Sequence, residues 1–394
     1  MQNDPIVIVS ANRTPMGGLL GSLKDVTTPQ LGAAAIQAAI KNAGIQADAV
    51  QEVIMGCVLP AGLGQAPARQ AAIAAGIPLG AGATTVNKMC GSGMKAVMLA
   101  HDLICAGTND IMVAGGMESM TQAPYLMLKG RTGYRLGHGQ LIDHMFLDGL
   151  EDAYERGKLM GLFAENTAQL YKFTREAQDK FAITSVERAQ KAAKEGCFAK
   201  EITPVTVKTA KDEFTVTEDD GPKTANIAKI PTLKPAFSKD GTVTAANSSS
   251  ISDGAAALIL MRRSMADKLG LKPLAIIRAH ATHSQEPQWF TTAPVGAIKS
   301  VLEKTHWTSK EVDLYEINEA FAVVTMAAMH DLDLPHDKVN IHGGACVLGH
   351  PIGASGARVL TTLIHNLERY QLKRGIATLC IGGGEATAMA VERV

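Results

Sequence analysis

The residue best placed for covalent chemistry is Cys90, which lies where a strand-like segment gives way to a helix-like one. The sequence around it is NKMCGSG, and the glycines after the cysteine allow a sharp turn into the helix. Unpaired amides and the dipole at a helix start favour negative charge, so they stabilise a thiolate. Cys90 is a candidate nucleophile, while a buried, inert cysteine is the alternative that its type and position leave open.

A histidine and a second cysteine in the C-terminal third could act on Cys90. His350 stands in the tight loop GHPIG at 349–353, before a helix-like segment, and Cys380 ends a strand-like segment. An imidazole close to a cysteine activates it as a nucleophile, and a second thiol can serve as an acid or base. Asn318 ends another strand-like segment and could hold a water or polarise a carbonyl, although alone it would be interpreted as a turn residue.

The segments that must position these residues alternate between strand and helix. Short apolar, β-branched runs predict strands, and longer periodic stretches predict helices, the first of which Gly44 should cap. Alternation at this short spacing predicts an α/β fold with a largely parallel sheet. The predicted strands are 6–10, 53–55, 84–86 and 110–114, and the predicted helices are 29–43, 67–75 and 94–104.

The final third of the chain repeats the pattern of the first. Positions 56 and 318, 93 and 356, and 115 and 382 occupy matching places and are 262, 263 and 267 residues apart. A period this long is not that of a solenoid. It predicts two similar α/β domains that pack together, with an active site between equivalent loops.

The stretch 121–250 differs from the rest of the chain in its composition and its pattern of predicted elements. A polar helix is predicted at 174–194, among loops rich in glycine, proline and charge, and no short buried strand is expected there. The serine-rich segment 245–254 marks the sharpest break in composition, after which apolar periodicity returns. We interpret the stretch as an insertion that lies over the core domains.

Composition excludes several classes of function. The 394 residues carry 38 basic and 38 acidic side chains, and 4% are aromatic, so no nucleic-acid partner is expected. No apolar run is long enough for a membrane helix, and the N-terminus shows no targeting pattern. Six cysteines without a CxxC pair argue against disulfides and structural zinc. We therefore expect a cytoplasmic protein with no resident metal.

Four motifs, taken in order, resemble those of thiolases, the acyl-CoA C-acyltransferases. Residues 87–93 look like the nucleophile loop of that family, and NEAF at 318–321 looks like its asparagine motif. The segment from GGA at 343 to GHPIGASGAR at 349–358 looks like its histidine loop, and CIGGG at 380–384 looks like its last cysteine motif. The resemblance runs along the whole chain.

The resemblance implies a thiolase-like, five-layered αβαβα fold of two pseudo-symmetric domains plus an inserted loop domain. It places the N-terminal domain at 1–121 and 251–273, the loop domain at 122–250 and the C-terminal domain at 274–394. It also implies a homodimer or homotetramer.

The same resemblance implies a reaction through an acyl group on Cys90. His350 would activate Cys90, and Cys380 would move the α-proton of a second acetyl-CoA. The backbone amides of Cys90 and Gly382 would stabilise the tetrahedral intermediate, and His350 with a water held by Asn318 would stabilise the enolate. Coenzyme A is part of the substrate, so no separate cofactor is expected.

The residues expected to bind coenzyme A match the family pattern less closely than the catalytic residues do. By resemblance, Ser249 would contact the pantetheine, with Leu150 and Phe237 along that arm. Ala320 and Phe321 would line the acyl end. Core or loop packing is the competing explanation for each of these residues.

Three departures from the family pattern concern specificity. Leu159 stands where many short-chain thiolases carry a histidine, so a polar partner of the substrate is missing. Lys223 stands near the place of a common arginine and is a weak candidate for the phosphates. The last motif continues with Glu385 and Ala386 where many members have Gln and Gly.

The sequence therefore predicts an acetyl-CoA C-acetyltransferase that interconverts two acetyl-CoA with acetoacetyl-CoA and CoA. The first alternative is a 3-ketoacyl-CoA thiolase of β-oxidation with a preference for longer chains, which Leu159 keeps open. A non-catalytic acyl-CoA-binding relative and a decarboxylating condensing enzyme are further alternatives. The presence of Cys90, His350 and Cys380 argues against the former, and the second cysteine argues against the latter.

Overall fold

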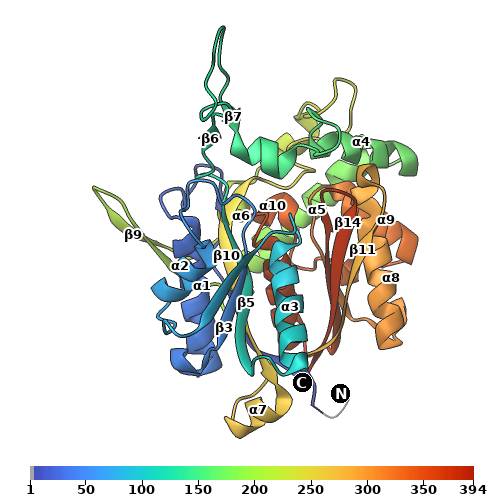
Figure 1. Ribbon diagram of the computed structural model, residues 1–394. Coiled ribbons are helices and arrows are strands. Elements are labelled where there is room, and N and C mark those ends of the chain that lie inside the picture. Colours follow the sequence, from blue (N-terminus) through green and yellow to red (C-terminus); the bar gives the residue numbers. More distant parts are fainter. Residues whose placement is uncertain (1–3) are drawn as a thin grey trace.

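A ten-stranded mixed sheet organises the chain in the computed structural model, which describes residues 4–394 (Figure 1). Nine strands run in the order β12-β13-β14-β11-β1-β10-β5-β3-β4, and β2 pairs with β10. The strands are β1 (Ile6–Arg13), β2 (Gly17–Gly18), β3 (Glu52–Gly56), β4 (Gly82–Val86), β5 (Ile111–Ser119), β10 (Ser252–Arg262), β11 (Ala275–Ser284), β12 (Leu314–Ile317), β13 (Arg374–Ile381) and β14 (Glu385–Arg393).

The prediction of a largely parallel sheet is wrong. Only the pairs β3·β4, β3·β5 and β12·β13 are parallel, and the other pairings are antiparallel. In the C-terminal half of the sheet, β13 and β14 are antiparallel because the three-glycine turn 382–384 joins them as a hairpin. In the other half, β10 returns antiparallel to β5 after the long insertion.

The helices and the two halves of the sheet form five layers around three hydrophobic cores. On β1, Val7 and Val9 belong to the core shared with helices α1 (Thr28–Ala43) and α2 (Pro67–Ala74). Ile6 and Ile8 point the other way, into the central core with α3 (Ser92–Ala106) and α11 (Ser355–Arg369). Beyond the second half of the sheet, α8 (Ala293–Thr305) and α9 (Ala322–Leu332) close a third core. The order is helix, sheet, helix, sheet, helix.

The two halves of the sheet repeat one another, as predicted. From the β1·β11 junction outward, one half reads β1-β10-β5-β3 and the other β11-β14-β13-β12, with the same sequence of antiparallel and parallel pairings. Helices α3 and α11 are the matching central pair and contact each other. The loops before these two helices carry Cys90 and His350, so the repeat itself brings the two residues toward one place.

Local signals explain where several elements begin and end. Helix α1 starts with a capping box between Thr27 and Gln30 and ends at Gly44, whose φ of 71° confirms the predicted cap. Strand β5 passes through Gly115 and Gly116, where the sequence predicted its end. A Cβ on Gly116 would overlap the carbonyl of Gly353, so this glycine serves the close approach of two backbones rather than a turn.

The insertion carries more strand than expected. It contains β6 (Tyr125–Leu126), β7 (Ile142–Asp143), α4 (Met160–Tyr171), α5 (Arg175–Lys194), β8 (Val205–Lys208), β9 (Glu213–Val216) and α6 (Asp220–Thr224). Val205 and Val207 on β8 are buried in the α1 core, which corrects the expectation that short buried strands are absent. A four-residue strand with two apolar positions is too short for its alternation to stand out.

Arg13 fixes the insertion to the core. Its fully buried guanidinium pairs with Glu201 Oε1 at 2.6 Å and with Asp219 Oδ1 at 2.7 Å. The remaining α-helices of the described residues are the short α7 (Arg263–Lys268) and α10 (Ala345–Leu348). Within residues 4–394, none of the helices combines the length and apolar character needed to cross a bilayer. The domain limits at 121, 250 and 273 stay a prediction.

Candidate active site

Cys90 lies immediately before α3, in a loop held in an uncommon conformation. Met89 has a φ of 47°, a left-handed backbone that side chains other than glycine rarely adopt. The amide of Lys88 donates to Ser92 Oγ at 2.8 Å, and that hydroxyl donates to the Met89 carbonyl at 2.6 Å. These two hydrogen bonds hold Met89 in its strained backbone conformation. Strained residues held in this way are typical of functional sites.

The surroundings of the Cys90 sulfur combine burial with hydrogen-bond donors. Burial raises the pKa of the Cys90 thiol to about 11, and the backbone amides of Gly382 and of Cys90 itself oppose this rise. Both amides therefore face the sulfur. They are the two donors that the sequence analysis expected at this place, and they can stabilise negative charge that develops on or beside the sulfur.

Cys380 lies at the end of β13, near Cys90. Burial raises the pKa of the Cys380 thiol well above the usual value, and the charge of a Cys90 thiolate raises it further. Two thiolates so close would repel each other, so one of the two sulfurs keeps a proton. Burial thus keeps both thiols protonated at neutral pH in the resting site.

His350 presents one nitrogen to the site and uses the other to hold its ring. Nδ1 lies 2.5 Å from Ser355 Oγ, and that hydroxyl donates to the Pro351 carbonyl at 2.9 Å. Because the single proton of Ser355 is used there, the network assigns the ring proton to Nδ1. Nε2 is buried, has no partner among the described residues and carries the free lone pair.

The imidazole of His350 is neutral. Burial lowers its pKa to about 3, with a further contribution from the Arg358 guanidinium. The amide of His350 donates to the Ser250 carbonyl at 3.1 Å, which ties the loop to the serine-rich segment. A neutral imidazole with an unprotonated Nε2 can accept a proton from a thiol.

Asn318 follows β12 and lies beside His350. Its Nδ2 is 3.4 Å from His350 Nδ1, and its Oδ1 accepts a hydrogen bond from Arg358 Nη2 at 3.4 Å. The neighbouring Glu319 is fully enclosed and was not assigned a role from sequence. It accepts from Ser185 Oγ at 2.7 Å and from the Cys346 amide at 3.1 Å, so it anchors the segment that leads to His350.

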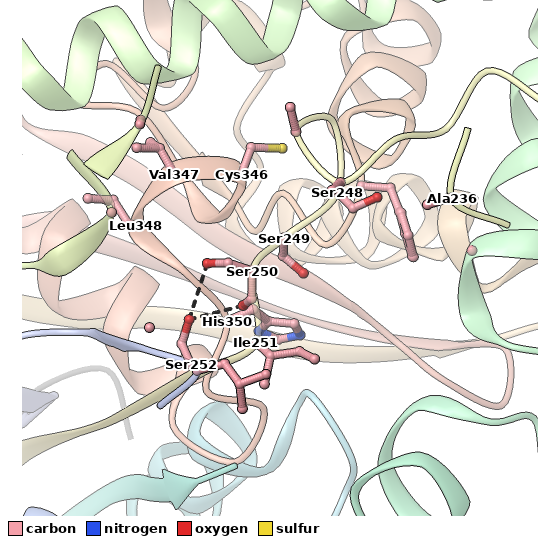
Figure 2. A pocket seen from close by; sticks show the side chains of 18 of the residues that line it. Ala236, Ser248, Ser249, Ser250, Ile251, Ser252, Cys346, Val347, Leu348 and His350 are labelled. Carbon is pink, nitrogen blue, oxygen red and sulfur yellow. Dashed lines mark hydrogen bonds between the residues drawn. The ribbon is translucent and has the colours of Figure 1, made fainter. Parts of the chain in front are cut away.

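A cavity of about 730 Å³ leads to this group, a size typical of sites for sizeable small molecules. Its polar side includes the serine-rich segment beside His350, whose hydroxyls at 250 and 252 hydrogen-bond to each other (Figure 2). Six residues singled out from the sequence line it: Leu150, Leu159, Phe237, Ser249, Phe321 and His350. The sequence analysis did not single out Cys346, which also lines the cavity, with its sulfur visible in Figure 2.

The other predicted residues stand behind the cavity wall. Cys90, Cys380, Asn318 and Gly382 do not line it, and Ala320 is buried in the apolar cluster that also contains Cys380. A Cβ on Gly382 would lie 3.3 Å from the sulfur of Met160, which does line the cavity.

The cation predicted for the phosphates is misplaced. Lys223 pairs with Glu218 at 2.9 Å and lines a different, smaller cavity. Lys229, which the sequence analysis did not consider, is exposed and lines the main cavity. Only the folded position of the segment distinguishes these two lysines, since nothing in their local sequence does.

Two carboxylates that were assigned no role from sequence hold the loops together. Glu118 on β5 is fully buried and accepts from the amides of Val58 and Gly353, each at 2.9 Å, although burial raises its pKa to about 7. Glu385, the departure noted in the last motif, pairs with Lys88 at 2.6 Å. That ion pair links the loop before Cys90 to the turn that carries Gly382.

Comparisons with known proteins match both parts of the chain to one family. Residues 6–264 match the thiolase N-terminal domain, and residues 271–393 match the thiolase C-terminal domain. An acetyl-CoA acetyltransferase from Cupriavidus necator is 48% identical, over 98% of this chain and 99% of the relative. A probable acetyl-CoA acyltransferase from Staphylococcus aureus is 45% identical over the same shares.

A solved structure is also very similar. The crystal structure of the Bacillus anthracis acetyl-CoA acetyltransferase superposes with a TM-score of 0.97, at 40% identity and over 99% of both chains. Both domain matches and the full-length relatives far exceed what a shared architecture alone would give. The chain belongs to the thiolase family.

Proposed function

We propose that this chain is an acetyl-CoA C-acetyltransferase that joins two acetyl-CoA into acetoacetyl-CoA and CoA, or runs the reverse thiolysis. Two observations support the proposal: one sulfur lies under two backbone amides with a second sulfur near it, and an imidazole with an unpartnered Nε2 lines a cavity of about 730 Å³. The names of the full-length relatives support the acetyl substrate.

In the first half-reaction, Nε2 of His350 takes the proton of the Cys90 thiol. The sulfur attacks the thioester carbonyl of acetyl-CoA, and the oxyanion forms where the amides of Cys90 and Gly382 point. The bond from the carbonyl carbon to the CoA sulfur then breaks. His350 returns the proton to that sulfur, and CoA leaves as a thiol with the acetyl group on Cys90.

In the second half-reaction, the sulfur of Cys380 takes a proton from the α-carbon of another acetyl-CoA. Burial raises the pKa of the Cys380 thiol well above its usual value, so the thiol proton first passes to Nε2 of His350, which is neutral again once CoA has left. The α-carbon attacks the acyl-cysteine and expels the Cys90 sulfur. The protonated His350 then passes its proton to the Cys90 sulfur, which restores two thiols and a neutral imidazole.

The cavity accounts for the rest of the substrate. Ser249 offers a hydroxyl to the pantetheine amides, while Leu150 and Phe237 pack along its apolar parts. Lys229 is the cation on the cavity wall, so we assign it to the phosphates in place of Lys223. Removal of Lys229 should raise KM for acetyl-CoA and leave kcat nearly unchanged, because the lysine is remote from the reacting carbon.

A 3-ketoacyl-CoA thiolase with a preference for longer chains is the second candidate. Leu159, Phe237 and Phe321 give the cavity an apolar wall, with no histidine at position 159. The Staphylococcus aureus relatives are named acyltransferases rather than acetyltransferases. These observations are compatible with an acyl chain beyond acetyl.

We also propose a cytoplasmic homodimer or homotetramer. All six cysteines are free, as a reducing compartment requires. The number of subunits would follow from light scattering of the purified protein.

Thiolysis of two substrates tests the proposal. We expect kcat/KM for acetoacetyl-CoA to exceed that for 3-oxodecanoyl-CoA. Faster cleavage of the longer substrate would favour the second candidate instead. Absence of turnover with both substrates, together with tight binding of acetyl-CoA, would support a non-catalytic binding protein.

A further inference from the structure

A cluster of two histidines and a carboxylate lies away from the active site, between the two halves of the molecule. His101 and Asp102 are on α3, and His280 is on β11. His101 Nδ1 lies 3.0 Å from Asp102 Oδ1, and His280 Nε2 lies 2.9 Å from the same oxygen. The three ligand atoms all fall within 4.8 Å of one another.

The chemistry of this cluster fits a transition-metal ion. Imidazole nitrogens and carboxylate oxygens bind zinc, cobalt and nickel at about 2.0–2.2 Å, which separates neighbouring ligand atoms by about 2.9–3.4 Å. The distances from His101 Nδ1 and His280 Nε2 to Asp102 Oδ1, 3.0 and 2.9 Å, fall in that range. The sequence shows no metal motif here because His280 is supplied by a strand distant in sequence from α3.

Exposure and charge around the cluster suit a bound cation. The histidine side chains are only 20% and 17% exposed, whereas Asp102 is 54% exposed, which leaves a path for the ion and for water ligands.

Two neighbouring groups define the site further. Lys304 donates through Nζ to the carbonyl of His280 at 2.8 Å, which holds the ammonium on the backbone. Cys105 Sγ lies 3.8 Å from Nε2 of His101, the nitrogen that faces away from Asp102, so the thiol is not one of the ligands in this arrangement.

We propose that His101, Asp102 and His280 bind one divalent transition-metal ion, such as zinc or cobalt, with water completing its coordination. The ion joins α3 to β11 and thereby fastens the N-terminal half of the sheet assembly to the C-terminal half. Bound metal therefore stabilises the folded protein, because the unfolded chain cannot bring residues 101 and 280 together.

Cobalt(II) is the probe for the test, because its binding can be counted by equilibrium dialysis and located by anomalous diffraction. We compare the wild type with His280→Ala and Asp102→Asn. His330→Ala is the matched control, since His330 makes a contact of 2.8 Å with its neighbour Asp331 but has no second histidine in a described cluster. Two variants at the site guard against misfolding of one, which circular dichroism would reveal.

We expect an anomalous peak between the three side chains and one more cobalt per chain in the wild type and His330→Ala than in the site variants. Cobalt should raise Tm by about 2–5 °C only in the proteins that keep the site. Metal held by the catalytic thiols would appear equally in all four proteins, so the difference isolates this cluster. Equal stoichiometry in all four, or soaked crystals without a peak here, would overturn the proposal.

Discussion

At the scale of single residues, the types and loop positions of Cys90, His350 and Cys380 made them candidates, and the resemblance to thiolases predicted their roles as a nucleophile, a base and a second thiol. The protonation state was not predictable, because it depends on contacts across the fold. Ser355 fixes the ring proton of His350, and burial keeps the imidazole neutral. From sequence, Ser355 is only the start of a helix.

The pKa values predict how Cys90 reacts with pH. With the pKa of Cys90 raised to about 11 and that of His350 lowered to about 3, the resting pair is a neutral thiol and a neutral imidazole. The rate of alkylation of Cys90 by iodoacetamide should therefore rise about tenfold per pH unit between about pH 7 and 9. Peptide mass spectrometry measures this rate, with Cys346, which lines the cavity, as an internal reference. A plateau below pH 8 would instead indicate a preformed thiolate–imidazolium pair.

Ser355 offers a second test at this scale. Ser355→Ala removes the acceptor of the Nδ1 proton, so the imidazole loses its fixed tautomer and orientation. We expect kcat to fall about 10- to 100-fold, KM to change little and the free energy of unfolding to fall by about 1–3 kcal/mol. Ser355→Thr, which keeps a hydroxyl, should recover much of the rate in a steady-state assay. An alanine variant as active as the wild type would show that Ser355 is not needed to orient the imidazole of His350.

At the scale of elements, most helices and strands were predictable from periodicity and caps, as α1 and its Gly44 cap illustrate. The directions of the strands and the full length of β5 could not be predicted in this way. Gly115 and Gly116 suggest a turn in the sequence, yet they lie inside a strand because other backbones pack against them. Contacts between loops, such as Lys88 with Glu385, are likewise invisible until the fold is known.

The Lys88–Glu385 pair should matter for rate more than for stability. Both side chains are partly exposed, so Glu385→Gln should change the free energy of unfolding by less than about 1 kcal/mol. The loops of Cys90 and Gly382 would lose their link, and we expect kcat to fall about tenfold. The double variant Lys88→Glu, Glu385→Lys should recover part of the rate. Unchanged kcat in Glu385→Gln would show that the pair does not position the two loops.

At the scale of the whole molecule, the internal repeat was the most informative feature of the sequence. It predicted two matching halves with the site between them, and the strand order of the sheet confirms the matching halves. The close contact of α3 with α11 was not predicted, although it sets the distance between the two halves. Gly93 and Gly356 make that contact possible, since a Cβ on Gly93 would lie 2.9 Å from the Ala357 amide nitrogen.

Separation of these helices should impair both stability and catalysis. Gly356→Ala adds a methyl group that would overlap the backbone of Met94, so α11 must move away from α3. We expect urea titration to show a loss of about 1–3 kcal/mol, and activity to fall at least tenfold. Gly80→Ala, whose new methyl would meet open space, is the control and should behave as the wild type. A fully active and stable Gly356→Ala protein would contradict this view of the central contact.

The central claim is that Cys90 carries the acyl group, and acetylation of the intact protein tests it most directly. Incubation with acetyl-CoA, a rapid acid quench and peptide mass spectrometry should show one acetyl group, on the peptide that contains Cys90. Addition of CoA before the quench should remove that group, because the first half-reaction is reversible. Turnover without acetylated Cys90, or an acetyl group on Cys346 or Cys380 in its place, would contradict the account.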